Sequence, residues 1–173
     1  MVQIRIATVE DVSTIAQLHA KSWQQHYRGI LSDDYLNHQV EEERLQVWTK
    51  RFEEARPNQH ILLAELNGQA CGFACVVGNE DPHFGSLLDN IHVSTRLQGQ
   101  GIGTILLKAA AKWSFENFPD KRFYLLVYQQ NGKALQFYQN LGGVIAARSL
   151  MDNPDGSKAM VVRVVWESNT EIQ

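Results

Sequence analysis

The residues that most clearly suggest chemistry are three closely spaced glycines, Gly99, Gly101 and Gly103, which lie between an apolar run and a helical pattern. The first N–H groups of a helix have no partner inside the helix, and they lie at the positive end of its dipole. Because glycine has no side chain, a diphosphate can approach such a backbone closely. The cluster therefore indicates a site for a phosphate-bearing ligand, although a tight structural turn would use glycines in the same way.

Two common phosphate-binding motifs do not fit this cluster. The P-loop pattern requires Gly-Lys-Ser/Thr, which does not follow the glycines. The dinucleotide pattern G-x-G-x-x-G requires a wider second interval, and here a hairpin rather than a βαβ unit precedes the glycines. A nucleotide-binding oxidoreductase domain is therefore disfavoured.

Hydrophobic periodicity around the glycines predicts a mixed α/β chain. Strands are expected at about 2–6, 61–66, 71–77, 87–93, 123–127, 144–147 and 160–166. Helices are expected at about 9–27, 41–52, 102–118 and 131–141, with a short one near 35–36, and a polar loop is expected at 78–85. Asn67-Gly68 predicts a tight hairpin turn. The helix after the glycines is expected to bury one apolar side, made of Ile102, Ile105, Leu106, Ala109 and Trp113.

The length of 173 residues predicts a single domain, 1–173, with a loosely ordered tail after about residue 167. The net charge of -3 gives no electrostatic reason to expect a nucleic-acid partner or an acidic membrane surface. We expect a cytoplasmic protein, because the start lacks a signal-peptide pattern and no apolar run approaches the ~20 residues that span a bilayer. Cys71 and Cys75 would lie about 13 Å apart in a strand, too far for a disulfide, and no Cys or His spacing suggests a metal site.

Two separated segments resemble the signatures of the GNAT superfamily of N-acetyltransferases. Residues 98–103 are similar to its Q/R-x-x-G-x-G/A signature, with Gln98, Gly101 and Gly103 in the specified positions. Residues 131–143 are similar to its N-x-x-A-x-x-F-Y-x-x-x-G motif, which is matched at Asn131, Ala134, Phe137, Tyr138 and Gly142. Residues 88–93 resemble the fourth strand of the family, and residues 23–36 resemble its helical acceptor-side segment. The resemblance covers about residues 3 to 166.

This resemblance implies a fold and an activity. The expected fold is the GNAT fold, an α/β domain with a mixed, mostly antiparallel sheet of about seven strands, splayed centrally, and about four to five flanking helices. The expected activity is transfer of an acetyl group from acetyl-CoA, the cosubstrate, to a primary amine by direct attack in a ternary complex. The alternative is a non-catalytic acyl-CoA-binding module that serves as a sensor or partner. No metal is expected, and a homodimer is a family expectation only.

The resemblance also assigns main-chain roles around the glycines. The diphosphate of coenzyme A is expected on backbone N–H groups of Gln98, Gly99, Gln100, Gly101, Ile102, Gly103 and Thr104. The pantetheine arm is expected along Ile91, His92 and Val93, where an N–H near Val93 would polarise the thioester carbonyl. Asn131 is expected to contact the same arm, to cap the following helix, or to do both.

The catalytic side chains are expected from the same resemblance. Tyr138 matches the tyrosine that protonates the departing thiolate, although helical spacing alone would make it a core aromatic. Asp89, a carboxylate in an otherwise apolar strand, is the favoured general base, with backbone donors satisfying it as the other interpretation. Weaker alternatives for the base are His26, Tyr27, His83 and His92.

The acceptor is left open by the sequence. Residues expected to contact it are Trp23, His26, Tyr27 and Tyr35, which would otherwise pack beneath the first helices. A polyamine, an amino acid, a small drug-like amine, a peptide N-terminus or a protein lysine would each supply the amine.

Overall fold

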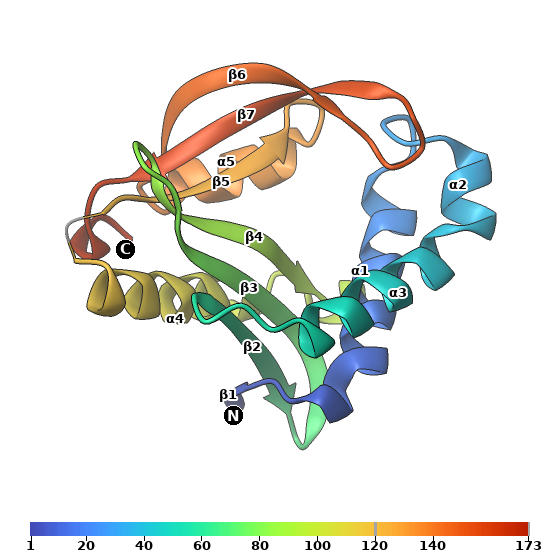
Figure 1. Ribbon diagram of the computed structural model, residues 1–173, viewed down its shortest axis with the longest axis horizontal. Helices are drawn as coiled ribbons and strands as arrows, with labels where there is room; N and C mark the ends of the chain where they lie inside the picture. Colours follow the sequence, from blue (N-terminus) through green and yellow to red (C-terminus); the bar gives the residue numbers. More distant parts are fainter. Residues whose placement is uncertain (120, 173) are drawn as a thin grey trace.

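A sheet in the strand order β1-β2-β3-β4-β5-β7-β6 forms the centre of the molecule (Figure 1). The computed structural model describes residues 1–119 and 121–172, and within them the sheet has seven strands. The strands are β1 (Val2–Ile6), β2 (Gln59–Leu66), β3 (Gln69–Asp81), β4 (Gly85–Val93), β5 (Phe123–Tyr128), β6 (Val144–Asp152) and β7 (Lys158–Trp166). Neighbouring strands are antiparallel except for β4 and β5, which are parallel. This arrangement confirms the expected mixed, mostly antiparallel sheet.

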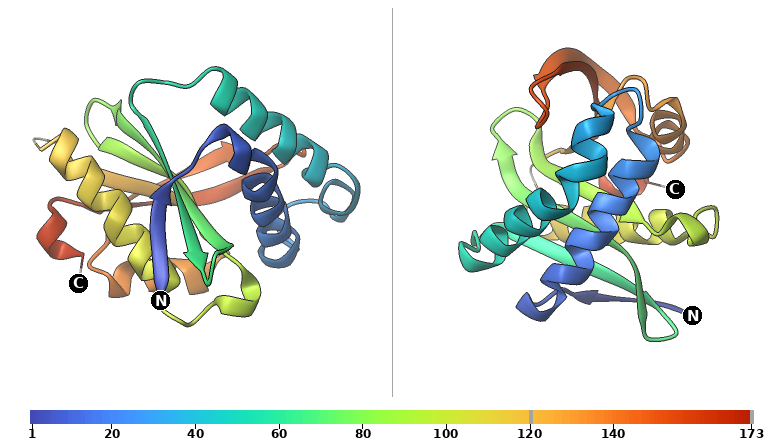
Figure 2. Two further views of the ribbon diagram at one scale, coloured as in Figure 1. Left: turned by 90° about the horizontal axis from the view of Figure 1, so that it is seen from below. Right: turned by 90° about the vertical axis from the view of Figure 1, so that its right-hand side faces the viewer.

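Helices cover both faces of this sheet. They are α1 (Val12–His26), α2 (Asp33–His38), α3 (Val40–Glu53), α4 (Ile102–Asn117) and α5 (Gly132–Asn140), with short 3₁₀ helices at Val9–Asp11, Thr95–Leu97 and Asn169–Glu171. Figure 2 places α1 to α3 on one side of the sheet and α4 on the other. None of the helices in the described ranges has the length and hydropathy needed to cross a bilayer.

Alternation along β3 explains how one strand supports both helical layers. Phe73 and Cys75 pack with residues of α1 and α3, whereas Ala74 and Val76 pack with residues of α4. Successive side chains of a strand point to opposite faces, so an apolar run buries both. Side chains of β3 thus pack against both helical layers beside the cleft described below.

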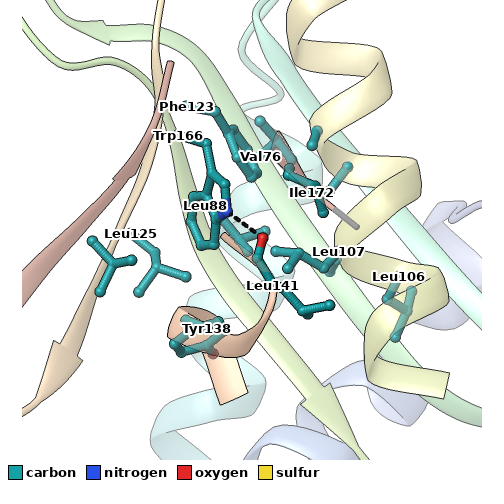
Figure 3. Close-up of a cluster of buried hydrophobic side chains, with 14 of the residues drawn as sticks. Val76, Leu88, Leu106, Leu107, Phe123, Leu125, Tyr138, Leu141, Trp166 and Ile172 are labelled. Carbon is teal, nitrogen blue, oxygen red and sulfur yellow. Dashed lines mark hydrogen bonds between the residues drawn. The ribbon is translucent and has the colours of Figure 1, made fainter. Parts of the chain in front are cut away.

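The C-terminal segment is part of the core. Ile172 is only 7% exposed and packs with Leu107, Phe123 and Trp166 (Figure 3). The indole Nε1 of Trp166 donates a hydrogen bond of 2.8 Å to the carbonyl of Leu141. This isoleucine therefore anchors the end of the segment through its buried side chain, and the loose order expected after residue 167 stays a prediction.

The β3–β4 hairpin is longer than the sequence predicts. Residues 78–81 continue β3 and Gly85 already belongs to β4, so the expected polar loop at 78–85 shrinks to residues 82–84. The Asp81 Oδ1 closes the turn by accepting hydrogen bonds of 2.8 Å from the backbone N–H groups of His83 and Phe84. Polar side chains in an exposed strand tip explain why the pattern resembled a loop.

Strands β4 and β5 separate soon after they meet. They are paired only at Ser86–Phe123 and Leu87–Tyr124. On its other side β4 contains a bulge, because Cys75 lies opposite Asn90 and Val76 lies opposite Leu88, which leaves Asp89 as the extra residue. The central splay expected of the fold is therefore present, and it opens directly beside Asp89.

Candidate functional site

A cavity of about 650 Å³ lies where β4 and β5 separate. It collects residues from five elements that are far apart in the sequence: α1, β4, the start of α4, β5 and α5. Most of the residues predicted from the sequence line it, namely His26, Tyr27, Asp89, Ile91, His92, Val93, Gln98, Gly99, Gly101, Ile102, Gly103, Thr104, Asn131 and Tyr138.

The glycine loop forms one end of this cavity. Gly99 and Gly101 have φ values of 78° and 80°, in the left-handed region that favours glycine. Gly101 is the N-cap of α4, and no side chain of the described residues caps this helix. A Cβ at either glycine would meet no atom within 4 Å. The first N–H groups of α4 are thus open to an anionic group, and the donor set fits a phosphate.

Asn131 caps the start of α5, which is one of the two roles predicted for it. Its side chain accepts a hydrogen bond of 3.3 Å from the backbone N–H of Ala134, at the start of α5. The residue also lines the cavity, so capping leaves it beside the space where a ligand would lie. Its contact with a bound ligand stays a prediction.

Tyr138 lies at the cavity wall with a ring that is largely buried. It is 9% exposed and packs edge-on against Phe137 and Trp166. Burial raises the pKa of its phenol above the usual value. Burial also raises the pKa of Tyr27, and the nearby hydroxyls of Tyr138 and Tyr128 raise it further. Tyr138 therefore holds its proton at neutral pH.

Asp89 is held by two neighbours that use the same carboxylate oxygen. Arg51 of α3 forms an ion pair of 2.5 Å with Oδ2, and Asn90 Nδ2 donates a 2.7 Å hydrogen bond to it. The side chain of Asp89 is 28% exposed. Asp89 also borders a second cavity of about 410 Å³ on the α3 side of the sheet, and it is the one residue that both cavities share. Both of these contacts therefore fall on Oδ2 rather than on Oδ1.

Two histidines at the cleft, His92 and His26, both contact Ser22 of α1. Burial, followed by the charges of His26 and Arg44, lowers the pKa of His92 to about 3. His92 is therefore neutral at physiological pH and a poor proton acceptor, and its Nδ1 lies 2.8 Å from Ser22 Oγ. His26 Nδ1 lies 2.8 Å from the carbonyl oxygen of Ser22, so this nitrogen donates and Nε2, 3.4 Å from Gln98 Nε2, is the acceptor.

Comparison with known proteins agrees with this geometry. The model of the "Acetyltransferase (GNAT) family" matches residues 17–142. The uncharacterized N-acetyltransferase YuaI of Bacillus subtilis (strain 168) is 30% identical over 142 residues, which cover 80% of this chain and 78% of YuaI. This chain belongs to the GNAT acetyltransferase family. It is accordingly an N-acetyltransferase.

Further relatives extend the comparison. The spermine/spermidine N(1)-acetyltransferase of Bacillus subtilis (strain 168) is 36% identical over 55 residues, 32% of this chain and 36% of that protein. The structure of the PaiA N-acetyltransferase from Thermoplasma acidophilum in complex with coenzyme A has a TM-score of 0.71 and 20% identity, covering 96% of this chain and 99% of that one. A GNAT structure from Rhodopseudomonas palustris has a TM-score of 0.75 and 19% identity, covering 95% and 94%. These likenesses show that the fold is the GNAT fold.

Four residues predicted for the site of this acetyltransferase do not line its cleft, and one of them, the weaker base candidate His83, is exposed in the β3–β4 turn. Tyr35 is 3% exposed and its hydroxyl donates to Glu43, whereas Trp23 packs against the guanidinium of Arg44, 4.4 Å from the ring centroid. Both aromatics hold α1, α2 and α3 together, so the structure places them in helix packing. Gln100 belongs to the glycine loop but is not among the residues that line the cavity.

Some residues of the acetyltransferase site were missed in the sequence. Arg51 of α3 pairs with Asp89 and lies over the ring of Trp48. Ser22 of α1 contacts His92 through its hydroxyl and His26 through its carbonyl oxygen. A charge among apolar helix positions was the available signal for Arg51. Ser22 had none. No group of three or more His, Cys, Asp or Glu side chains within 1–119 and 121–172 could hold a metal ion.

Proposed function

We propose that the protein binds acetyl-CoA in the cleft between β4 and β5 and transfers the acetyl group to a primary amine of a small molecule. The observation that carries this proposal is the combination of diverging strands with an uncapped helix start at the end of the cleft. The family membership supports acetyl transfer. The Thermoplasma PaiA structure was solved with coenzyme A, and the YncA structure from Salmonella typhimurium with acetyl-CoA.

The binding roles follow from the backbone. Residues 98–104 offer N–H groups to the diphosphate, and Gly99 and Gly101 keep the approach free of side chains. Ile91, His92 and Val93 lie beyond the last pair with β5, so β5 occupies none of their backbone groups, although the Val93 carbonyl accepts a 3.3 Å hydrogen bond from Gln98 Nε2. An extended ligand can add to such an edge like a further strand. One of these N–H groups would polarise the thioester carbonyl.

The chemistry requires two proton transfers around one bond exchange. The amine nitrogen attacks the thioester carbon, a C–N bond forms, and the C–S bond breaks. We propose that Asp89, through Oδ1, takes the proton of the attacking amine directly or through water, and that Tyr138 protonates the departing thiolate. The retention of both groups favours an enzyme over a non-catalytic acyl-CoA-binding sensor.

Thermal unfolding with acetyl-CoA, coenzyme A and NAD tests the proposal. A ligand at ~100 times its dissociation constant adds about 2.7 kcal/mol to the free energy of unfolding, which shifts the midpoint by several degrees. We expect a shift with acetyl-CoA and coenzyme A and none with NAD. An absence of any shift with acetyl-CoA would overturn the assignment. Release of free thiol that depends on an added amine separates the enzyme from the sensor.

A further inference from the structure

Arg163 is the one charged residue in the apolar part of strand β7, residues 159–166. Its neighbours Val162 and Val164 are fully buried in the core on the α4 side. In the antiparallel register Arg163 lies opposite Leu126 of β5, so both side chains point to the other face of the sheet. Leu126 is 38% exposed and lines the cleft. Arg163 is therefore a direct neighbour of the cleft wall, on the face that does not carry α4.

The guanidinium of Arg163 is held in place without an ionic partner. Its Cζ lies 4.0 Å from the ring centroid of Phe84 and 5.1 Å from that of Tyr124. No carboxylate of the described residues lies within 4.0 Å of it. Asp81 acts on it electrostatically, but the Oδ1 of Asp81 is engaged in closing the β3–β4 turn. Aromatic stacking therefore orients the guanidinium while leaving its donors available.

One donor of this side chain is buried with no hydrogen-bond partner. Arg163 Nε is among the few buried side-chain nitrogen and oxygen atoms in the described residues that lack one. An unsatisfied buried donor is costly, and a missing ligand is one of its ordinary explanations. Arg44, which is stacked on Trp23, has an unpartnered Nε in the same way, so the stacking itself encloses this atom. The terminal nitrogens of the guanidinium are therefore the donors that an anion would meet.

The position of Arg163 relative to Asp89 sets what that anion can be. Tyr124, under the guanidinium, pairs with Leu87 at the point where β4 leaves β5. Asp89 lies two residues further along β4 and contacts α3, so it also points away from α4. Burial raises the pKa of Tyr124, and the charges of Asp81, Arg163, Glu80 and Asp89 all act on it, as expected if they surround this ring. Arg163 lines neither cavity itself, but its guanidinium lies over Tyr124, beside the cleft and on the face of the sheet to which Asp89 points.

We propose that Arg163 binds a carboxylate of the acceptor, so that the acceptor is a small molecule of the amino-acid class with a primary amine and a carboxylate. This inference rests on the proposed function and names its substrate class. A guanidinium presents parallel N–H donors that match the two oxygens of a carboxylate. With the carboxylate at Arg163, the amine would point across the opening toward Asp89. A polyamine offers nothing to Arg163 and would be repelled by it.

Matched probes test this class directly. The common amino acids are compared with their carboxamides, and L-lysine and L-ornithine with cadaverine and putrescine, which have the same amines without the carboxylate. Spermidine is included. Initial rates of thiol release and the product masses are measured with the full chain and acetyl-CoA. We expect at least one carboxylate-bearing probe to have a kcat/KM about tenfold or more above that of its partner.

Two outcomes would overturn the inference. One is turnover of carboxamides or polyamines at rates equal to or above those of the acids, and the other is failure of every carboxylate-bearing probe to react. Neither outcome touches the binding of acetyl-CoA, which the thermal shift measures separately. A chain that shows no shift with acetyl-CoA fails at the proposed function instead.

Variants at Arg163 distinguish recognition from packing. Arg163→Met keeps the stem between the rings and is expected to raise KM for the acid roughly 10- to 100-fold, to abolish the preference over the amide, and to leave the acetyl-CoA shift unchanged. Arg163→Lys, which keeps the charge, is expected to retain part of the preference and decides the matter if the Met variant does not fold. Arg148→Met, on the exposed strand β6, is the matched control and is expected to behave as wild type. An equal loss toward acid and amide in the folded Arg163 variant would contradict the inference.

Discussion

Asp89 is the residue at which the geometry and the proposed chemistry are most closely joined. It is the extra residue of the β4 bulge, it borders both cavities, and Arg51 and Asn90 occupy one of its oxygens. The bulge turns the carboxylate toward α3 at the point where the cleft opens. A single carboxylate oxygen is thus held in place with the other left open, which suits a group that must accept a proton repeatedly.

Asp89→Asn is the first residue-scale prediction. The amide keeps the shape but cannot take the amine proton, so kcat/KM is expected to fall about 100-fold or more. The acetyl-CoA thermal shift should persist. Glu42→Gln, on the exposed side of α3, is the control and should retain full activity. Full activity in the Asn variant would remove the base from Asp89 and leave His26 Nε2 as the next acceptor to test.

Tyr138→Phe tests the second proton. Loss of the hydroxyl is expected to lower kcat about 100-fold while acetyl-CoA binding changes little. Because burial raises the pKa of Tyr138, the wild-type phenol should stay protonated up to the usual phenol range near pH ~10, and kcat should not fall before then. A kcat profile to pH ~10 measures this. Tyr35→Phe, whose hydroxyl contacts Glu43 in the helix packing, should remain active. A decline of wild-type kcat well below that pH would argue against the phenol as the acid.

The side chains that line the cleft were predictable where a motif specified them, and elsewhere the sequence left their place open. Tyr138 and Asn131 line the cleft as the motif implies. Trp23 and Tyr35 were assigned from a segment whose aromatics serve packing equally well, and only tertiary contacts distinguish the two uses. Arg163 was visible as a single charge among valines, but a strand pattern does not say which residues lie across from it.

At the scale of elements, the junction between β4 and α4 is the most constrained part of the chain. Gly101 adopts φ 80° at the N-cap, a conformation that costs an L-residue roughly 1–2 kcal/mol. Gly132 also begins a helix, but its φ is not positive and a Cβ there would meet no atom within 4 Å. A comparison of substitutions at Gly101 and Gly132 therefore separates the effect of backbone conformation from the effect of available space.

Gly101→Ala is therefore expected to lower the free energy of unfolding by about 1 kcal/mol and to weaken acetyl-CoA binding, because the loop must change its backbone. Gly132→Ala is expected to be neutral or slightly stabilising. Chemical denaturation and titration with acetyl-CoA measure the two effects. Equal behaviour of the two variants would show that the left-handed conformation does not control the loop.

Element types were predicted well from periodicity, whereas the buried side of α4 was predicted in part: Ile102 and Leu106 are buried as expected, and Ala109 and Trp113 pack against the core. Ile105 was expected to be buried and is 41% exposed, whereas Leu107, Ala110 and Ala111 are fully buried. Apolar residues cover most of the circumference of this helix, so spacing alone cannot select the side that meets the sheet. Strand ends were underestimated at β3 for a related reason, since an exposed hairpin tip has a polar sequence.

At the scale of the whole molecule, the C-terminal segment connects the last strand to the layer of α4. Ile172 packs in the larger core, next to Trp166 and Leu107. Ile172→Ala is expected to lower the free energy of unfolding by about 2 kcal/mol, since buried Ile-to-Ala changes typically cost 2–5 kcal/mol and a terminal site relaxes more readily. Thermal unfolding checks it, with Val9→Ala, at a 67% exposed position, as the control. No loss of stability would mean that the tail is dispensable.

The sparse pairing between β4 and β5 has a mechanical consequence. In the described residues, two backbone pairs join the half of the sheet made by β1 to β4 to the half made by β5 to β7. The boundary between β4 and β5 is therefore a seam, and a small separation of the two halves of the sheet along it would break few backbone hydrogen bonds. An extended ligand bound to the free edge of β4 would bridge that seam, and deuterium uptake by the amides along it would slow even though no element moved.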